Sequence, residues 1–154
     1  MNKNDWIYLA GFIDGEGNIG IDKYGKYRNS INYACKVAIS NTNREVLEWI
    51  KSCCGGYIST LKRKLPHHKE CYQLTLRHLC AYKMLKEVEP YLKIKRELAQ
   101  IAIRVGQRCQ IKYDHKRIKS LERRMADEAD FHLIKSIIGC TRHNESLMPL
   151  IEEE

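Results

Sequence analysis

The chain has 154 residues, with 27 Lys and Arg against 19 Asp and Glu, which gives a formal net charge of +8 at pH 7. That length suits one domain with a sizeable core, and the basic surplus suits a polyanionic partner such as nucleic acid. No apolar run approaches the roughly 20 residues of a membrane span and no signal-peptide pattern opens the chain. We therefore expect an intracellular protein with no membrane partner, in a compartment that the sequence does not identify.

The first predicted element is an apolar helix that runs into the stretch Leu-Ala-Gly-Phe-Ile-Asp-Gly-Glu-Gly at residues 9–17. Apolar residues cover almost its whole circumference, so we expect it to be buried; they are Trp6, Ile7, Leu9, Ala10, Phe12 and Ile13. Gly11 and Gly15 stand four apart on one face, where another backbone can approach closely. Asp14 and Glu16 follow at the negative end of the helix dipole, and a bound divalent cation is the simplest compensating charge.

Two strands are expected next, over residues 18–26, with a turn near 23–26, and over residues 31–40. The second strand alternates between an apolar face and a polar, basic face. Its apolar residues are Ile31, Tyr33, Cys35, Val37 and Ile39, and the opposite face carries Asn32, Ala34, Lys36, Ala38 and Ser40. Asn41-Thr42-Asn43 then caps a helix that Gly55-Gly56 ends.

A second hairpin is expected over residues 57–65 and 70–77, followed by helices over 78–91 and about 95–108. The region from 114 to about 138 is expected to form two further helices, of which one is basic through Lys116, Arg117, Lys119, Arg123 and Arg124. This order predicts an α+β fold with an antiparallel sheet. We expect a single domain over 1–154, with its core at about 4–108 and a C-terminal helical extension at about 109–154.

The stretch at residues 9–17 resembles the LAGLIDADG motif of homing endonucleases, with Phe12, Gly15 and Glu16 as variants within the pattern. From spacing alone, the alternative is a tightly packed core helix that ends in a glycine turn with solvated acids. The resemblance covers about residues 4–108, where the element order agrees with the αββαββα core of that family. Because the sequence holds one copy of the motif, the resemblance implies a homodimer. The residues expected at its interface are Ile7, Ala10, Gly11 and Asp14.

The resemblance also implies a metal site at the end of the motif helix. In the family, the acid in the eighth motif position ligates a metal at the DNA backbone. Glu16 and the backbone carbonyl of Gly15 are therefore expected to hold Mg²⁺, with Mn²⁺ or Ca²⁺ as other occupants, and two copies of Glu16 would converge in the dimer. Asp14 is expected to cap or buttress the helix end rather than to ligate.

The remaining catalytic roles implied by the family are to position the attacking water and to stabilise the developing phosphorane charge. Ser40 or Asn41 fits the first role, and the choice between them stays open. Arg44 and Lys95 fit the second, with Lys93 as a rival to Lys95. Without the resemblance, Arg44 and Lys95 are ordinary helix-surface charges.

Sequence recognition would fall to the polar face of the four strands, because a two-stranded ribbon fits the major groove and a strand rises about 3.3 Å per residue, close to the base-pair step. The alternative is a solvated sheet face, which the basic cluster at 62–64 disfavours. The candidate DNA-binding residues are Asp22, Tyr24, Lys26, Arg28, Asn29, Ser30, Asn32, Lys36, Lys62, Lys64, Gln73, Thr75 and Arg77.

Together with these features, the resemblance implies a metal-dependent, site-specific endonuclease that cuts double-stranded DNA at a long pseudo-palindromic site, works as a homodimer and serves intron homing. Two alternatives use the same fold: a group I intron RNA maturase and a DNA-binding protein that does not cleave. The motif acid, Glu16, favours the nuclease and is also compatible with a second use in RNA splicing.

Overall fold

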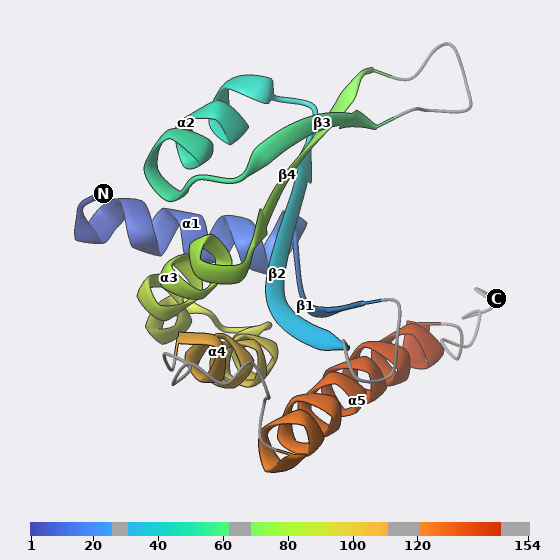
Figure 1. The fold of residues 1–154 in the computed structure, drawn as a ribbon. Helices are drawn as coiled ribbons and strands as arrows, with labels where there is room; N and C mark the ends of the chain where they lie inside the picture. Colours follow the sequence, from blue (N-terminus) through green and yellow to red (C-terminus); the bar gives the residue numbers. More distant parts are fainter. Residues whose placement is uncertain (26–30, 62–68, 111–120, 146–154) are drawn as a thin grey trace, which may run out of the picture.

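The computed structural model describes residues 1–25, 31–61, 69–110 and 121–145, and these form a four-stranded sheet with helices (Figure 1). The elements in chain order are α1 (Lys3–Glu16), β1 (Gly17–Tyr24), β2 (Asn32–Asn41), α2 (Arg44–Cys54), β3 (Tyr57–Leu61), β4 (Cys71–Arg77), α3 (His78–Val88), the 3₁₀ helix η2 (Glu89–Tyr91), α4 (Arg96–Gln110) and α5 (Leu121–Glu145). The expected α+β fold is confirmed. In the described ranges, no helix combines the length and the apolar character needed to cross a membrane.

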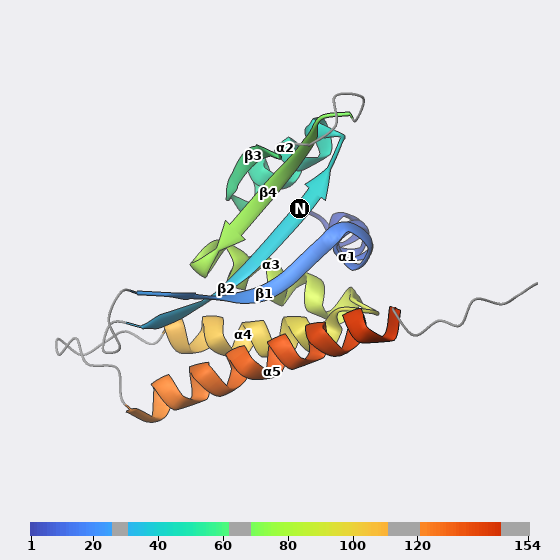
Figure 2. The same ribbon diagram turned by 90° about the vertical axis from the view of Figure 1, so that its right-hand side faces the viewer.

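The strands lie in the order β1-β2-β4-β3, and all neighbours are antiparallel. Helices α1 to α4 lie on one side of the sheet, and Figure 2 looks onto the other side, which they leave open. The core forms between the sheet and these helices. Its fully buried large side chains include Leu9, Ile13, Ile19, Ile39, Leu47, Ile50, Leu74, Leu76, Met84, Leu85, Leu92 and Ile101.

Capping residues mark both ends of α2 and the start of α1. Asn43 accepts the backbone N–H of Val46 and so caps α2, as expected from the Asn41–Asn43 run. Gly55, which follows α2, has φ = 80°, a conformation that favours glycine and ends the helix. At α1, Asn2 and Asp5 form a reciprocal capping box, in which each side chain accepts the other residue's backbone N–H.

Helix α1 is not buried around its whole circumference, contrary to the expectation from its composition. Leu9, Ala10 and Ile13 are fully buried against the core, but Ile7 and Tyr8 are 45% and 54% exposed. The reason is that α1 packs against the sheet, α3 and η2 through the side that carries Leu9, Ala10 and Ile13, whereas Tyr8 meets the Trp49 ring of α2 in an edge contact. The apolar residues on its other side therefore face outward in the single chain.

The C-terminal extension also differs from the prediction. Residues 121–145 form one helix, α5, rather than parts of two, and no Gly or Pro interrupts its sequence from 121 to 138. Of the five expected basic residues, Arg123 and Arg124 lie in α5, and Lys116, Arg117 and Lys119 lie outside the described residues.

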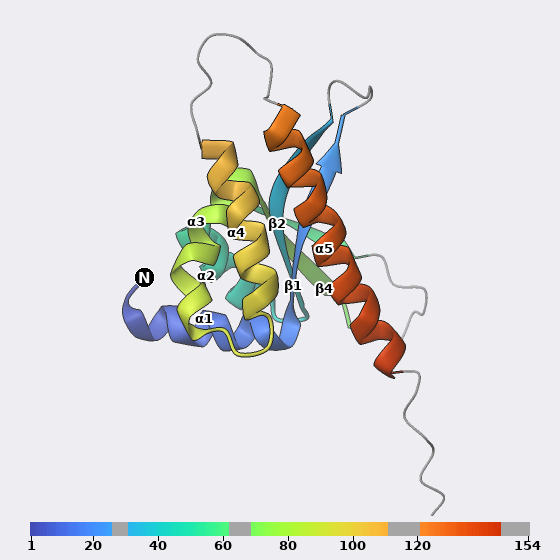
Figure 3. The ribbon, with the colours of Figure 1, turned by 90° about the horizontal axis from the view of Figure 1, so that it is seen from below.

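Helix α5 lies alongside α4 and contacts β1 and β2 (Figures 2 and 3). Two buried acids on α5 hold it to α4. Asp130 accepts from Arg104 at 2.6 Å, and Asp127 accepts from Arg108 at 2.7 Å. On the neighbouring turn, the Phe131 ring packs against the buried Tyr33 of β2 at 5.5 Å between centroids. Ion pairs and apolar contacts therefore both dock α5.

Candidate active site and nucleic-acid interface

Glu16 is the last residue of α1, and its side chain is exposed. The chain passes directly from it into β1 through Gly17. A Cβ at position 17 would lie 2.7 Å from the Ile13 carbonyl oxygen, so only glycine allows this tight passage from helix to strand. The sequence thus fixes the Glu16 carboxylate at the junction between α1 and the edge strand β1.

The positive charge at the end of α1 comes from Lys95, which lies between η2 and α4. Its ammonium group donates to the carbonyl oxygens of Ile13 at 2.9 Å and Asp14 at 2.7 Å. Burial lowers the pKa of Lys95, and this effect outweighs the opposing attraction of Asp14 and Glu16. A bound divalent cation is thus not the only positive charge at this helix end, because a lysine from a distant segment also compensates the helix dipole in the part of the chain that the structure describes.

The Asp14 carboxylate accepts hydrogen bonds from three backbone N–H groups just before α4. It accepts from Lys93 at 2.7 Å, from Ile94 at 3.2 Å and from Lys95 at 2.9 Å. Burial raises the pKa of Asp14, but these three hydrogen bonds outweigh it and hold the pKa below its usual value. Asp14 thus joins the end of α1 to the start of α4.

Ser40 and Gln73 come together at the same end of the sheet as Glu16. Gly17 of β1 pairs with Ile39 of β2, so Glu16, just before β1, lies next to Ser40 near the end of β2. Ser40 pairs in turn with Gln73, whose side-chain amide donates to the Ser40 hydroxyl at 3.1 Å. The sequence had suggested only a base-reading role for Gln73, and its proximity to Ser40 follows from a strand order that the sequence does not reveal.

Asn41 and Arg44 lie at the same end, but both have local partners. The Asn41 side chain accepts the backbone N–H of Asn43 at 2.8 Å and so shapes the turn before α2. The Arg44 guanidinium pairs with Glu48, one helical turn later, at 3.2 Å and lies over the Tyr72 ring at 5.4 Å. The structure therefore gathers Glu16, Ser40, Asn41, Arg44 and Lys95 at one end of the sheet. The Glu16 side chain is exposed, whereas the other four side chains have partners within the chain.

A single chain offers few metal ligands at this end. In the described ranges, no group of three or more His, Cys, Asp or Glu side chains could hold a metal ion. The available oxygen donors are the exposed Glu16 carboxylate and the backbone carbonyl of Gly15. This donor set fits Mg²⁺, which prefers oxygen ligands and keeps several waters, if a second chain completes it.

The exposed face of α1 carries Ile7, Gly11 and Gly15 at intervals of four residues. An added Cβ at Gly11 or at Gly15 would meet no atom within 4 Å. Ala10 does not share this face, because it is fully buried in the core of its own chain. Its expected place in a dimer interface is therefore wrong for this structure, and Asp14 points its carboxylate at residues 93–95 instead of outward.

The open face of the sheet carries the expected DNA-binding residues that the structure describes. Asp22, Tyr24, Asn32, Lys36, Gln73 and Arg77 alternate in register with the core residues and share this face. Thr75 belongs to the same row but is only 3% exposed, so the expectation that its hydroxyl contacts DNA is not supported. The remaining candidates lie outside the described residues: Lys26, Arg28, Asn29, Ser30, Lys62 and Lys64.

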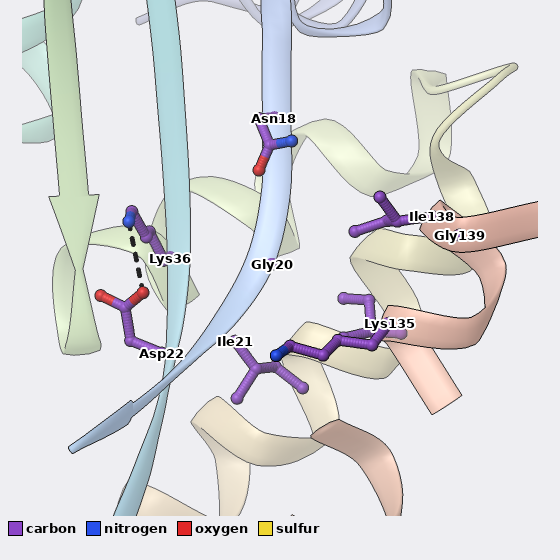
Figure 4. Close-up of a pocket in the computed structure, with 9 residues that line it drawn as sticks. Asn18, Gly20, Ile21, Asp22, Lys36, Lys135, Ile138 and Gly139 are labelled. Carbon is purple, nitrogen blue, oxygen red and sulfur yellow. Dashed lines mark ion pairs between the residues drawn. The ribbon is translucent and has the colours of Figure 1, made fainter. Parts of the chain in front are cut away.

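A hollow separates β1 from α5 at the edge of this face (Figure 4). Its polar lining comes from Asn18, Asp22 and Lys36 on the strands and from Lys135 on α5, whose side chain extends toward β1. Its apolar lining comes mainly from Ile134 and Ile138 of α5. Helix α5 therefore forms one wall beside the open face.

Comparison with known proteins points to one family. The family model described as "LAGLIDADG endonuclease" matches residues 9–94, more than half of the chain. The homing endonuclease I-CvuI, in complex with its target in the presence of Ca, has a TM-score of 0.55 at 16% identity, over 87% of this chain and 94% of its own. The meganuclease I-SmaMI, bound to uncleavable DNA, has a TM-score of 0.56 at 16% identity, over 90% of this chain and 45% of its own. A comparison with curated protein sequences found no match.

Proposed function

The chain belongs to the LAGLIDADG endonuclease family, and on that premise we propose that it is a site-specific endonuclease that cuts both strands of duplex DNA. The observation that carries the proposal is the position of Glu16. Its exposed carboxylate lies at the end of the motif helix, at the margin of a sheet whose open face bears Lys36 and Arg77. An acid at the edge of a basic, strand-built surface suits hydrolysis of a phosphodiester held on that surface.

We propose that the active form is a homodimer joined through α1. The support is the outward face of this helix, where Gly11 and Gly15 leave open space and Ile7 is exposed. Small residues at intervals of four let two helices approach closely. Two chains joined in this way would bring two copies of Glu16 together, and would explain why the described residues of one chain supply no group of three or more metal-ligating side chains.

We propose that Glu16 and the Gly15 carbonyl of each chain hold a divalent metal, Mg²⁺ in the first instance. When bound, such an ion lowers the pKa of water and stabilises negative charge on the phosphate oxygens. Around it, the Ser40 hydroxyl and the Gln73 amide would orient the attacking water. Lys95 would keep the end of α1 in place and add positive charge close to Glu16.

The open face of the sheet would then bind the DNA on either side of the cut. In a symmetric dimer, two copies of this face read two half-sites, which predicts a long, pseudo-palindromic target. The related I-CvuI was solved with its target DNA in the presence of Ca, and with the I-CreI target, not cleaved, in the presence of Mg. By analogy with the family, we propose intron homing as the biological role of the cleavage.

The direct test is cleavage of a randomised duplex library with Mg²⁺, with and without EDTA, followed by sequencing of the cut ends. We expect cuts at one extended near-palindrome, and only with metal. Glu16→Gln should abolish cutting and leave specific binding largely intact. Glu87→Gln, which removes the same charge from an exposed site on α3, is the matched control and should cut normally. Cutting by Glu16→Gln at the wild-type rate would refute the metal assignment, and specific binding without any cutting would indicate a non-cleaving DNA-binding protein.

A further inference from the structure

Three charged side chains on the open face form one ion cluster across three strands. Asp22 of β1 lies between Lys36 of β2, at 3.2 Å, and Arg77 of β4, at 2.8 Å. Lys36 and Arg77 are register partners in neighbouring strands, so both reach Asp22 from the same row of the sheet. Figure 4 shows the Lys36 ammonium directed at the Asp22 carboxylate. One acid therefore fixes two cations on the surface proposed to bind DNA.

The Arg77 guanidinium is held on two sides. Its Nε lies 2.8 Å from an Asp22 carboxylate oxygen in an ion pair, and its central carbon lies 5.9 Å from the centroid of the Tyr57 ring. The Arg77 side chain is 43% exposed. Among the residues that the structure describes, no other acceptor takes an ion pair or hydrogen bond from it. Its two terminal nitrogens therefore have no ion-pair or hydrogen-bond partner among the described residues, while the Asp22 ion pair and the Tyr57 ring restrict the guanidinium on the open face of the sheet.

A bidentate arginine fork matches the O6 and N7 acceptors of guanine in the major groove. A phosphate is a poorer match here, because the Asp22 carboxylate repels an anion and leaves the three-residue cluster with a net charge of only +1. A hollow also lies beside the Arg77 guanidinium, lined by Asp22, Lys23, Tyr24, Ala34, Arg77 and His78, with Lys23 paired to Glu128. A base edge can therefore approach Arg77 without displacing a large side chain.

From this geometry we propose that Asp22 is a positioning residue for specificity, and that Arg77, held by it, reads one guanine in each half-site. The inference rests on the proposed DNA-binding function. Asp22 does not itself contact the base in this arrangement. It restrains the guanidinium through the ion pair at Nε and reduces the attraction of the cluster for phosphates, so that binding at this position depends on base identity.

The test is selection of bound sequences from a randomised duplex library in EDTA, so that cleavage plays no part, with a salt titration of the best site. The variants are Asp22→Asn, Arg77→Lys and the double variant. Arg77→Lys keeps the charge and removes the fork. Glu89→Gln is the matched control, because Glu89 accepts from the Nε of Arg96 at the same 2.8 Å but lies among α1, α3 and α4. Thermal unfolding of each variant verifies that it is folded.

We expect the wild type to prefer guanine at one symmetric pair of positions by about ten- to a hundredfold. Arg77→Lys and Asp22→Asn should both lose that preference at the same positions, and the double variant should lose no more. Asp22→Asn should also bind unrelated DNA more tightly, with a steeper salt dependence, because its cluster carries one more positive charge. Asp22→Glu, which restores the carboxylate, should recover part of the preference.

Two other results would overturn the inference while leaving the proposed function intact. The first is a wild-type base preference that neither variant changes at any one position. The second is loss of preference at different positions in the two variants, which would make Asp22 a base reader in its own right. If the wild type selects no DNA sequence at all, the proposed function itself fails, and the inference fails with it.

Discussion

Asp14 and Lys95 hold each other through two reciprocal hydrogen bonds, although 81 positions separate them in the chain. The Asp14 carboxylate accepts the backbone N–H of Lys95 at 2.9 Å, and the Lys95 ammonium donates to the Asp14 carbonyl at 2.7 Å. The pair joins the end of α1 to the segment that enters α4. Because Glu16 follows Asp14 by two residues, the orientation of the proposed metal ligand depends on a contact with a distant part of the chain.

Asp14→Ala is expected to lower the free energy of unfolding by about 1–3 kcal/mol, because three backbone N–H groups lose a charged acceptor. Urea unfolding at pH 7 measures the change. Glu87→Ala, on an exposed part of α3, is the control and should stay within about 0.5 kcal/mol of the wild type. Equal stability of the two variants would show that the hydrogen bonds of the Asp14 carboxylate contribute little to the free energy of unfolding.

Lys95→Met is expected to slow cleavage by at least about tenfold, since charge-stabilising groups in active sites typically contribute that much or more. Specific DNA binding should change little, because Lys95 lies at the end of α1 rather than on the open face of the sheet. Single-turnover cleavage and binding without metal separate the two effects. Lys93→Met is the matched comparison, because the Lys93 side chain is exposed and only its backbone N–H meets Asp14. Normal cutting by Lys95→Met together with slow cutting by Lys93→Met would show that Lys93, and not Lys95, stabilises the charge that develops during cleavage.

Gly11→Leu is expected to abolish the dimer in sedimentation without destabilising the single chain. A side chain at position 11 meets no atom of its own chain within 4 Å, and leucine has a higher helix propensity than glycine by roughly 0.5–1 kcal/mol. Gly139→Leu is the matched control, because Gly139 is also helical with open space at its Cβ but lies in α5. A dimer that survives Gly11→Leu would place the interface elsewhere.

The parts of the fold that sequence reasoning predicted are those that local chemistry determines. Asn43 and Gly55 fix the two ends of α2, and the alternation along residues 31–40 identifies the core face of β2. The composition of α1 predicted a fully buried helix, which is wrong. An apolar residue such as Ile7 gives the same sequence pattern whether it packs within its own chain or faces outward. A single sequence does not distinguish these two environments.

The unpredicted features of the site all join segments that lie far apart in the chain. Asp22 meets Arg77 only because β2 pairs with both β1 and β4, and Ser40 meets Gln73 for the same reason. The Lys95 cap on α1 likewise needs the packing of η2 and α4 beside that helix. The residue types were visible in the sequence, but their partners followed from strand order and helix packing.

Asp130 on α5 gives the docking of this helix a definite pH dependence. Burial raises the pKa of Asp130, but the hydrogen bonds from Arg104 and Arg108 outweigh it and hold the pKa below its usual value. A carboxyl whose pKa is lower in the folded state stabilises the fold above its unfolded pKa and loses that contribution as the pH falls through its folded pKa. The ion pairs between α4 and α5 should therefore act fully at neutral pH and weaken in acid, below about pH 4.

Asp130→Asn is accordingly expected to lower the free energy of unfolding at pH 7 by about 1–2 kcal/mol, at the lower end for a broken ion pair because Arg104 is 49% exposed. Urea unfolding at pH 7 and at pH 3 should show this difference shrinking as wild-type Asp130 becomes protonated. Glu122→Gln, an exposed acid in the first turn of the same helix, is the control and should not reproduce the trend. A difference that stays constant between the two pH values would mean that α5 is docked by the Phe131 and Ile134 contacts, with the ion pairs contributing little.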